Sequence, residues 1–185
     1  KGGSVLEPSF GQGVFFDQLT NMGVQQKDFT GFEIFKPNYD IVWQKYPEAN
    51  LYNTYFEYAT LSDKDFKSIA KFEPDLVKPE LKKSYDLIIG NPPYGDHKSP
   101  HGYLFDSKAQ IRAEGFFLYL CAELLAKNGV MVMILPSLWL YNGDKYDKQK
   151  KMISKHLELV DAYRLPNNVF EKTKIATDIT VWKRK

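Results

Sequence analysis

The stretch YDLIIGNPPY, residues 85–94, constrains the fold of this chain more than any other part of the sequence. Residues 85–89 form a short run of branched and aromatic side chains, which predicts a buried central strand. Gly90 ends the run, and the two prolines after Asn91 fix φ and lack the N–H groups that a strand ladder needs. A residue before proline is pushed out of the helical region. We therefore expect Asn91 on a stiff, extended turn at the carboxyl edge of a sheet, where open α/β sheets bind ligands.

A second turn lies near the start of the chain. Residues 4–7 predict a strand, residues 8–13 contain Gly11 and Gly13, and residues 14–19 have apolar positions at helical spacing. A strand, a glycine turn and a helix in this order open a nucleotide-binding βαβ unit. Glu33 follows Gly13 by twenty residues, close to the spacing at which an acidic side chain reaches ribose hydroxyls. Phe16 replaces the third glycine of the dinucleotide pattern, which favours a nucleoside cofactor without phosphates; the alternative is an ordinary βα turn with a surface glutamate.

The remaining pattern alternates between strands and helices and predicts a doubly wound α/β domain. Residues 111–127 predict the clearest helix, with Asn128 and Gly129 as its C-terminal stop. Residues 130–135 are apolar on both faces, as in a central parallel strand. The other expected strands are 29–34, 50–53, 159–165 and 176–182, and the other expected helices are 36–46, 61–72 and 146–157.

The turn at Asn91 has the groups to activate an amino nitrogen on a nucleobase. The lone pair of such a nitrogen is delocalised into the ring, so two acceptors that bind its hydrogens favour a pyramidal, nucleophilic nitrogen. The amide oxygen of Asn91 and the main-chain carbonyl of Pro92 are candidates for these acceptors, and Tyr94 for a stacking surface. Such contacts strengthen as the nitrogen gains positive charge, which stabilises the transition state. The alternative is a rigid Pro-Pro turn with a half-buried tyrosine.

Two motifs in this order, Glu7-Pro8-Ser9-Phe10-Gly11-Gln12-Gly13 and then Asn91-Pro92-Pro93-Tyr94, resemble the S-adenosylmethionine-dependent N6-adenine DNA methyltransferases of the gamma class. The stretch 168–174 before the last expected strand is also similar to that class. The resemblance implies a class I methyltransferase fold, which is a Rossmann-like, doubly wound, mainly parallel seven-stranded sheet whose last strand is antiparallel. It also implies adenine-specific DNA methylation with S-adenosylmethionine as the cofactor.

The resemblance assigns a role to each matching position. It implies that Glu7 and the turn through Pro8, Ser9, Gly11 and Gly13 line the methionine part of the cofactor. It implies ribose binding by Glu33, contacts to the cofactor adenine by Phe56 and Phe117, and capture of the target adenine by Asn91, Pro92, Pro93, Tyr94 and Phe170. The family usually has an aspartate just before the aromatic at position 56; this chain has none there, and Asn53 is the candidate substitute.

Composition limits the other possibilities. The 185 residues fit one domain, and a net charge of +2 does not by itself imply nucleic acid. The single cysteine, Cys121, excludes an internal disulfide and favours a reducing, cytoplasmic compartment. No signal peptide or apolar run of about 20 residues is present, so no membrane association is expected. His97 and His101 lack companion ligands, so we expect no metal and favour contact with DNA phosphate or an idle surface loop.

We expect residues 1–185 to be one catalytic domain of a longer polypeptide, with the N-terminal helix and target-recognition domain of the family outside it. The expected partner is double-stranded DNA with a flipped adenine, because the amino group is paired inside the helix. The recognition domain is then elsewhere in the polypeptide or in a partner subunit. Two alternatives stay open. One is a methyltransferase acting on RNA or protein glutamine, against which Glu7-Pro8-Ser9 argues; the other is a non-catalytic binding module of a larger restriction or helicase protein, against which the intact Asn91 turn argues.

Overall fold

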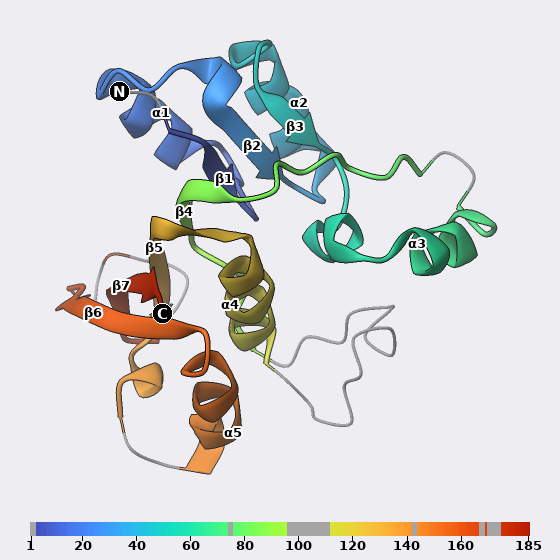
Figure 1. Ribbon diagram of the computed structural model, residues 1–185. Coiled ribbons are helices and arrows are strands. Elements are labelled where there is room, and N and C mark those ends of the chain that lie inside the picture. The colour runs from blue at the N-terminus through green and yellow to red at the C-terminus, as the bar shows by residue number, and fades with distance from the viewer. Residues whose placement is uncertain (1–2, 74–75, 96–111, 142–143, 167–168, 170–174) are drawn as a thin grey trace.

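The computed structural model describes residues 3–73, 76–95, 112–141, 144–166, 169 and 175–185 (Figure 1). The strands are β1 Val5–Glu7, β2 Phe29–Phe32, β3 Asn50–Tyr52, β4 Tyr85–Gly90, β5 Leu125–Pro136, β6 Leu157–Arg164 and β7 Thr177–Arg184. The α-helices are α1 Val14–Asn21, α2 Lys36–Lys45, α3 Asp63–Ala70, α4 Ala113–Leu124 and α5 Asp144–Ile153. Short 3-10 helices lie at η1 Gln26–Asp28, η2 Phe56–Thr60 and η4 Ser137–Trp139.

The strands form one seven-stranded sheet in the order β3-β2-β1-β4-β5-β7-β6. Strands β1 to β5 pair in parallel, and β7 is antiparallel to both of its neighbours, β5 and β6. The prediction of a mainly parallel sheet with an antiparallel last strand is therefore confirmed. β4, which carries the Asn91 turn at its end, is the central strand, as its apolar sequence predicted.

Successive residues of the parallel strands point into two different cores. Val5 packs with Phe16 and Val42 under α1 and α2, whereas Leu6 packs with Phe117 under α4. This alternation is the side-chain period of a strand, and because both faces of the sheet are covered, apolar residues occupy both faces of the parallel strands. In Figure 1, α1 and α2 accompany β1 to β3, while α4 and α5 lie together beside the other half of the sheet. α3 stands to one side on a small cluster of its own.

The predicted helix at residues 111–127 ends earlier than its sequence suggested. α4 stops at Leu124, and Asn128 and Gly129 lie inside β5, where the pairing with β4 is irregular. A Cβ on Gly129 would lie 2.9 Å from the carbonyl oxygen of Tyr85, so glycine is required here by a close approach of two strands. A glycine that serves this contact and one that stops a helix look the same in a sequence.

The last helix and the strand after it are also displaced from the prediction. α5 ends at Ile153 instead of residue 157, and β6 begins at Leu157. Leu157 is buried in the main core, so its apolar character belongs to the strand and not to the helix. Cys121 is buried in the same core as predicted, and burial raises the pKa of its thiol.

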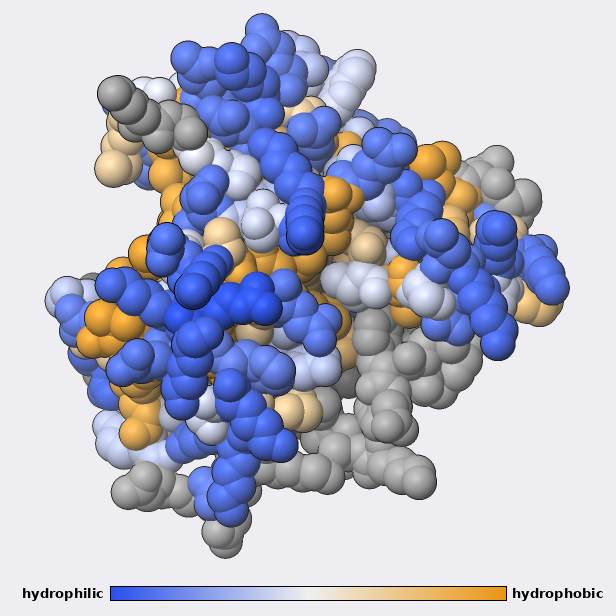
Figure 2. All heavy atoms as spheres, in the orientation of Figure 1, coloured by the Kyte–Doolittle hydropathy of each residue, from blue (hydrophilic) through white to orange (hydrophobic). Residues whose placement is uncertain are grey.

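The surface in Figure 2 is mostly hydrophilic, with hydrophobic residues in separate small patches. Among these exposed hydrophobic residues, Ile34 and Phe35 lie at the carboxyl end of β2, next to the site described below. No helix in the described part of the chain has the length and apolar character that crossing a membrane requires.

Candidate active site

A cavity of about 320 Å3 opens at the carboxyl ends of four neighbouring parallel strands. Its wall is built from the segments that follow β1, β2, β3 and β4, together with one residue of α4. The lining residues are Pro8, Ser9, Gly11, Phe32, Glu33, Ile34, Thr54, Tyr55, Phe56, Glu57, Asn91, Pro93 and Phe117. The two motifs that stood out in the sequence, eighty residues apart, therefore share one cavity.

The predicted glycine turn lies between β1 and α1. Gly11 and Gly13 have φ of 53° and 76°, in the left-handed region that glycine adopts without strain. The amide of Gly13 donates to the carbonyl of Phe10 over 2.8 Å, and α1 begins at the next residue. Gly11 lines the cavity, while Gly13 packs away from it, against Val42 of α2.

Glu33 fixes the turn to the end of β2. One of its carboxylate oxygens accepts the Gly11 amide over 2.9 Å, and the other accepts the Phe35 amide over 2.7 Å. A carboxylate has about four lone-pair sites, so two acceptor positions remain for a ligand in the cavity. Asn53 supports this arrangement from outside the cavity, because its amide donates to the main-chain carbonyl of Glu33 over 2.7 Å and to that of Ile34 over 3.3 Å.

Glu7, the last residue of β1, is a buried carboxyl directly before the turn. Its Oε2 atom has no hydrogen-bond partner among the described residues. Burial raises the pKa of Glu7 well above its ordinary value, and the charges of Glu33 and Asp17 raise it further. Buried polar atoms normally have partners, so this oxygen is suited to a positively charged or donating group of a ligand.

Aromatic rings form one side of the cavity. The centroids of Phe56 and Phe117 are 5.6 Å apart, the distance of a directly contacting aromatic pair. Phe32 lies 5.3 Å from Phe56 in an edge-on arrangement. Because Phe56 and Phe117 touch each other, they are neighbouring parts of one apolar wall.

The turn after β4 lies against the glycine turn. A Cβ on Gly90 would come within 3.3 Å of Pro8, and the Ser9 hydroxyl donates to the main-chain carbonyl of Asn91 over 3.3 Å. The Tyr94 hydroxyl makes a short contact to the Asn91 amide oxygen and lies 3.1 Å from the carbonyl oxygen of Ile134. Burial, together with the charge of Glu114, raises the pKa of this phenol, so it stays a protonated donor.

The structure brings together most of the residues that the sequence singled out. Those that line the cavity are Pro8, Ser9, Gly11, Glu33, Phe56, Asn91, Pro93 and Phe117. Five others support the wall without lining it, namely Glu7, Gly13, Asn53, Pro92 and Tyr94. Phe170, His97 and His101 lie outside the described residues. No cluster of three potential metal ligands occurs within the part of the chain that the structure describes.

Sequence reasoning missed one acidic residue of the site. Glu57 lines the cavity and is almost fully buried, immediately after Phe56 at the start of η2. The family pattern has its acid before the aromatic at position 56, whereas Glu57 directly follows it, so the pattern does not point to Glu57. Ile34, Thr54 and Tyr55 were also missed, because they belong to the loops and not to a motif.

Comparison with known proteins agrees with this geometry. A family model described as Eco57I restriction-modification methylase matches residues 18–170, which is most of the chain. The chain belongs to this family. Among curated proteins, the Eco57I-family chain is 34% identical over 97 residues to the methylase subunit of the type I restriction enzyme EcoEI of Escherichia coli. That match covers 51% of this chain and 20% of the subunit.

Solved structures show that this Eco57I-family chain has the class I S-adenosylmethionine-dependent methyltransferase fold. A class I methyltransferase from Listeria monocytogenes matches with a TM-score of 0.71 at 16% identity, over 100% of this chain and 54% of that protein. A modification subunit of a type I restriction enzyme from Vibrio vulnificus matches with a TM-score of 0.71 at 20% identity, over 98% of this chain and 40% of the subunit. The chain thus spans between a fifth and about half of the length of these relatives.

Proposed function

We propose that this chain transfers a methyl group from S-adenosylmethionine to the N6 amino group of adenine in DNA. The observation that carries the proposal is the shared cavity, in which the Asn91 turn lies directly against the glycine turn. Family membership supports methylation in restriction and modification, and the contact between the two turns supports an amino nitrogen as the acceptor.

The residues of the cavity fit the proposed cofactor. The turn at Pro8, Ser9 and Gly11 would hold the methionine part, and the free acceptor positions of Glu33 suit ribose hydroxyls. The apolar wall at Phe56 and Phe117 suits the adenine ring. The unpartnered oxygen of Glu7 is a buried acceptor beside the turn, and the sulfonium and ammonium groups of a bound cofactor would favour its ionised form. When bound, S-adenosylmethionine supplies an electrophilic methyl group on its sulfonium.

Asn91 acts on the acceptor nitrogen. Its amide oxygen and the main-chain carbonyl of Pro92 accept the two hydrogens of the adenine amino group, which leaves the lone pair of the nitrogen free for attack. These hydrogen bonds strengthen as positive charge develops on the nitrogen, so they stabilise the transition state more than the ground state. The adenine must leave the duplex to reach this edge of the sheet, because its amino group is otherwise paired.

The relatives suggest how the chain meets DNA. EcoEI's methylase subunit and the Vibrio vulnificus modification subunit are parts of type I restriction enzymes, and this chain spans less than half of either. We infer that the chain is the catalytic core of such a methylase and that target recognition lies elsewhere in the polypeptide or in a partner subunit.

Replacing Asn91 tests the proposal. Asn91→Ala should lower kcat for methyl transfer to DNA by about 10²- to 10³-fold, the usual effect of removing one polar group that stabilises transition-state charge. The dissociation constant for S-adenosylmethionine, measured by calorimetry, should not change. Asn21→Ala, at the exposed end of α1, is the matched control and should retain full activity. Loss of cofactor binding in Asn91→Ala, or full turnover without the amide, contradicts the assigned role.

The acceptor class needs a separate measurement. The chain is incubated with S-adenosylmethionine carrying a labelled methyl group and with DNA, RNA or protein, and the labelled product is identified. We expect label on adenine N6 of DNA. Transfer to RNA or to protein glutamine, without transfer to DNA, would overturn the proposed substrate while leaving the methyltransferase assignment intact.

A further inference from the structure

The residue that follows the Asn91 turn is fastened to the first turn of α4 through both of its main-chain polar groups. The Gly95 amide donates to Oε2 of Glu114 over 3.0 Å, and the Gly95 carbonyl accepts the Ala113 amide over 2.9 Å. Gly95 has φ of 110°, a conformation that other residues adopt only with strain. The chain therefore leaves Tyr94 in one defined direction.

Glu114 is held on both sides. Its side chain has no exposed surface, and its Oε1 atom accepts from Nε of Arg112 over 2.8 Å. It lies in the first turn of α4, where the helix dipole favours a negative charge. A buried carboxylate with both oxygens engaged has little freedom to move, so it fixes the position of the Gly95 amide.

The same helix contributes to the cofactor side of the cavity. Phe117 follows Glu114 by three residues, which places both on neighbouring positions of one helix face. Phe117 lines the cavity, and Glu114 holds the end of the Asn91 turn. On the other side, Gly95 directly follows Tyr94, whose hydroxyl contacts the Asn91 amide oxygen. A short series of contacts therefore connects α4 to the acceptor atom of Asn91.

We propose that Glu114 is a positioning residue for methyl transfer, which holds the Asn91–Tyr94 turn at a fixed place relative to the cavity through its hydrogen bond from Gly95. The role rests on the proposed function of the cavity. Its physical reason is that transfer between two bound groups depends steeply on alignment, and a displacement of about 1 Å costs up to ~10²-fold in rate. The Gly95 amide is held by a side chain, so the position of the turn depends on the length of that side chain.

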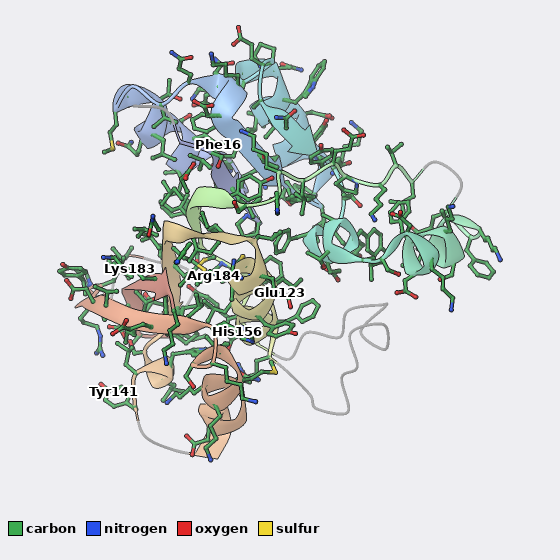
Figure 3. The ribbon with its side chains drawn as sticks, in the orientation of Figure 1. Phe16, Glu123, Tyr141, His156, Lys183 and Arg184 are labelled. Carbon is green, nitrogen blue, oxygen red and sulfur yellow. The ribbon has the colours of Figure 1, made fainter. Side chains whose placement is uncertain are left out.

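Substitutions at Glu114 distinguish the effect of side-chain length from the effect of charge. Glu114→Gln keeps the length and an acceptor oxygen but removes the charge, whereas Glu114→Asp keeps the charge and is one methylene shorter. Glu114→Ala removes both. Glu123→Ala is the matched control, because Glu123 is an exposed acid at the other end of the same helix, where Figure 3 shows it near Arg184 of β7.

Three quantities are measured on the full chain of each variant: hydrogen exchange of the Gly95 amide by NMR, kcat for methyl transfer, and the dissociation constant for S-adenosylmethionine. We expect Glu114→Gln to keep Gly95 protected, because its amide oxygen can still accept that N–H. Its kcat should stay closer to wild type than that of Glu114→Asp, although its NH2 group cannot accept from Arg112. Glu114→Asp should lose the protection and about 10- to 100-fold in kcat, with unchanged cofactor binding. Glu123→Ala should match the wild type in all three.

Each remaining outcome decides the question. If Gly95 stays protected in Glu114→Asp, or loses protection without any change in kcat, the positioning role is overturned. If kcat of Glu114→Gln falls as far as kcat of Glu114→Asp, the rate depends on the charge of the side chain and not on its length. That result also overturns the positioning role. If the wild-type chain binds the cofactor but does not methylate DNA, the proposed function is refuted, and so is the role of Glu114 in catalysis. Hydrogen exchange of the Gly95 amide still shows in that case whether Glu114 holds the turn. Glu114→Ala removes the buried carboxylate that pairs with Arg112 and can therefore fail to fold. The test rests on Glu114→Gln and Glu114→Asp for this reason.

Discussion

Two carboxyl groups near the glycine turn illustrate how differently one residue type is used within a few ångströms of a cavity. Glu33 has both oxygens engaged by main-chain amides and still has acceptor capacity for a ligand. Glu7 is almost completely buried, and one of its oxygens has no partner among the described residues. Glu33 contributes to the architecture of the site, whereas an unsatisfied Glu7 costs stability that a ligand could recover.

Glu7→Gln should make the protein more stable at neutral and alkaline pH. The pKa of Glu7 is raised in the folded state above 4.5, so its contribution to stability is present below pH 4.5 and is lost as the pH rises through the folded pKa. Glutamine does not ionise, so the variant does not lose stability as the pH rises. Urea unfolding at pH 8 should show a gain of about 1–3 kcal/mol for the variant.

The same comparison at pH 4.5 is the control for Glu7→Gln, and there the difference between the two proteins should shrink. An equal difference at both pH values would show that the effect is not due to ionisation. The stabilised variant should also bind S-adenosylmethionine more weakly, because it lacks the negative charge that we assign to the cofactor site.

The inserted strand β7 is held to its antiparallel neighbour β5 by side chains as well as by the backbone ladder. The hydroxyl of Thr180 donates to the carbonyl of Met133 on β5 over 2.8 Å, and it accepts Nε1 of Trp182 over 2.8 Å. Thr180 has no exposed surface and Trp182 is also buried. Because both side chains are buried, no water is available to replace this polar contact.

Thr180→Val should destabilise the fold by about 1–3 kcal/mol, because it leaves a buried indole N–H and a buried carbonyl without their partner while keeping the shape of the side chain. Urea unfolding followed by tryptophan fluorescence measures the loss. Trp182→Phe removes the indole donor, and the double variant should cost less than the sum of the two single ones. Additive losses would show that the two side chains do not act together.

The sequence could predict those elements whose signals are local and have one physical meaning. The strand predicted at residues 85–89, the stiff turn at Asn91 and the glycine turn at Gly11 and Gly13 follow from branched side chains, prolines and glycines within a few residues. The end of α4 could not be predicted, because Gly129 is required by contact with Tyr85, which is distant in the sequence.

The same limit applies to the site. Glu33 and Asn91 were identified because each belongs to a motif with known spacing, whereas Glu114 reaches Gly95 across nineteen residues. The contact between Phe56 and Phe117 likewise depends on the packing of α4 against the sheet, which sequence alone does not give.

The net charge of the whole chain determines how strongly it is attracted to the phosphates of DNA. The chain has 25 basic and 23 acidic residues, a net charge of +2, and the surface in Figure 2 mixes hydrophilic residues with scattered apolar ones. Phosphate contacts supply most of the affinity of proteins for duplex DNA, and each requires a basic side chain. A nearly neutral chain therefore lacks a strong overall electrostatic attraction to duplex DNA.

The chain by itself should bind duplex DNA weakly and without sequence preference, in the range of about 10⁻⁴–10⁻⁶ M at physiological salt that is usual for non-specific contacts. Gel-shift titrations with several unrelated duplexes, repeated at low and moderate salt, measure this. Cofactor binding by the same samples serves as a control for folding. A tight complex with one duplex and not with the others would show that this chain carries a recognition surface of its own.

The reversed direction of β7 has a consequence for how such a domain can diversify. Because β7 runs against β5, the chain leaves β6 at Arg164 and enters β7 at Thr177 on the same rim of the sheet at which β4 delivers Asn91. A connection anchored at both ends by one antiparallel hairpin can lengthen, shorten or change its chemistry without shifting the register of the remaining strands. Changes on that rim can thus leave the glycine turn after β1, on the opposite side of β4, unaltered.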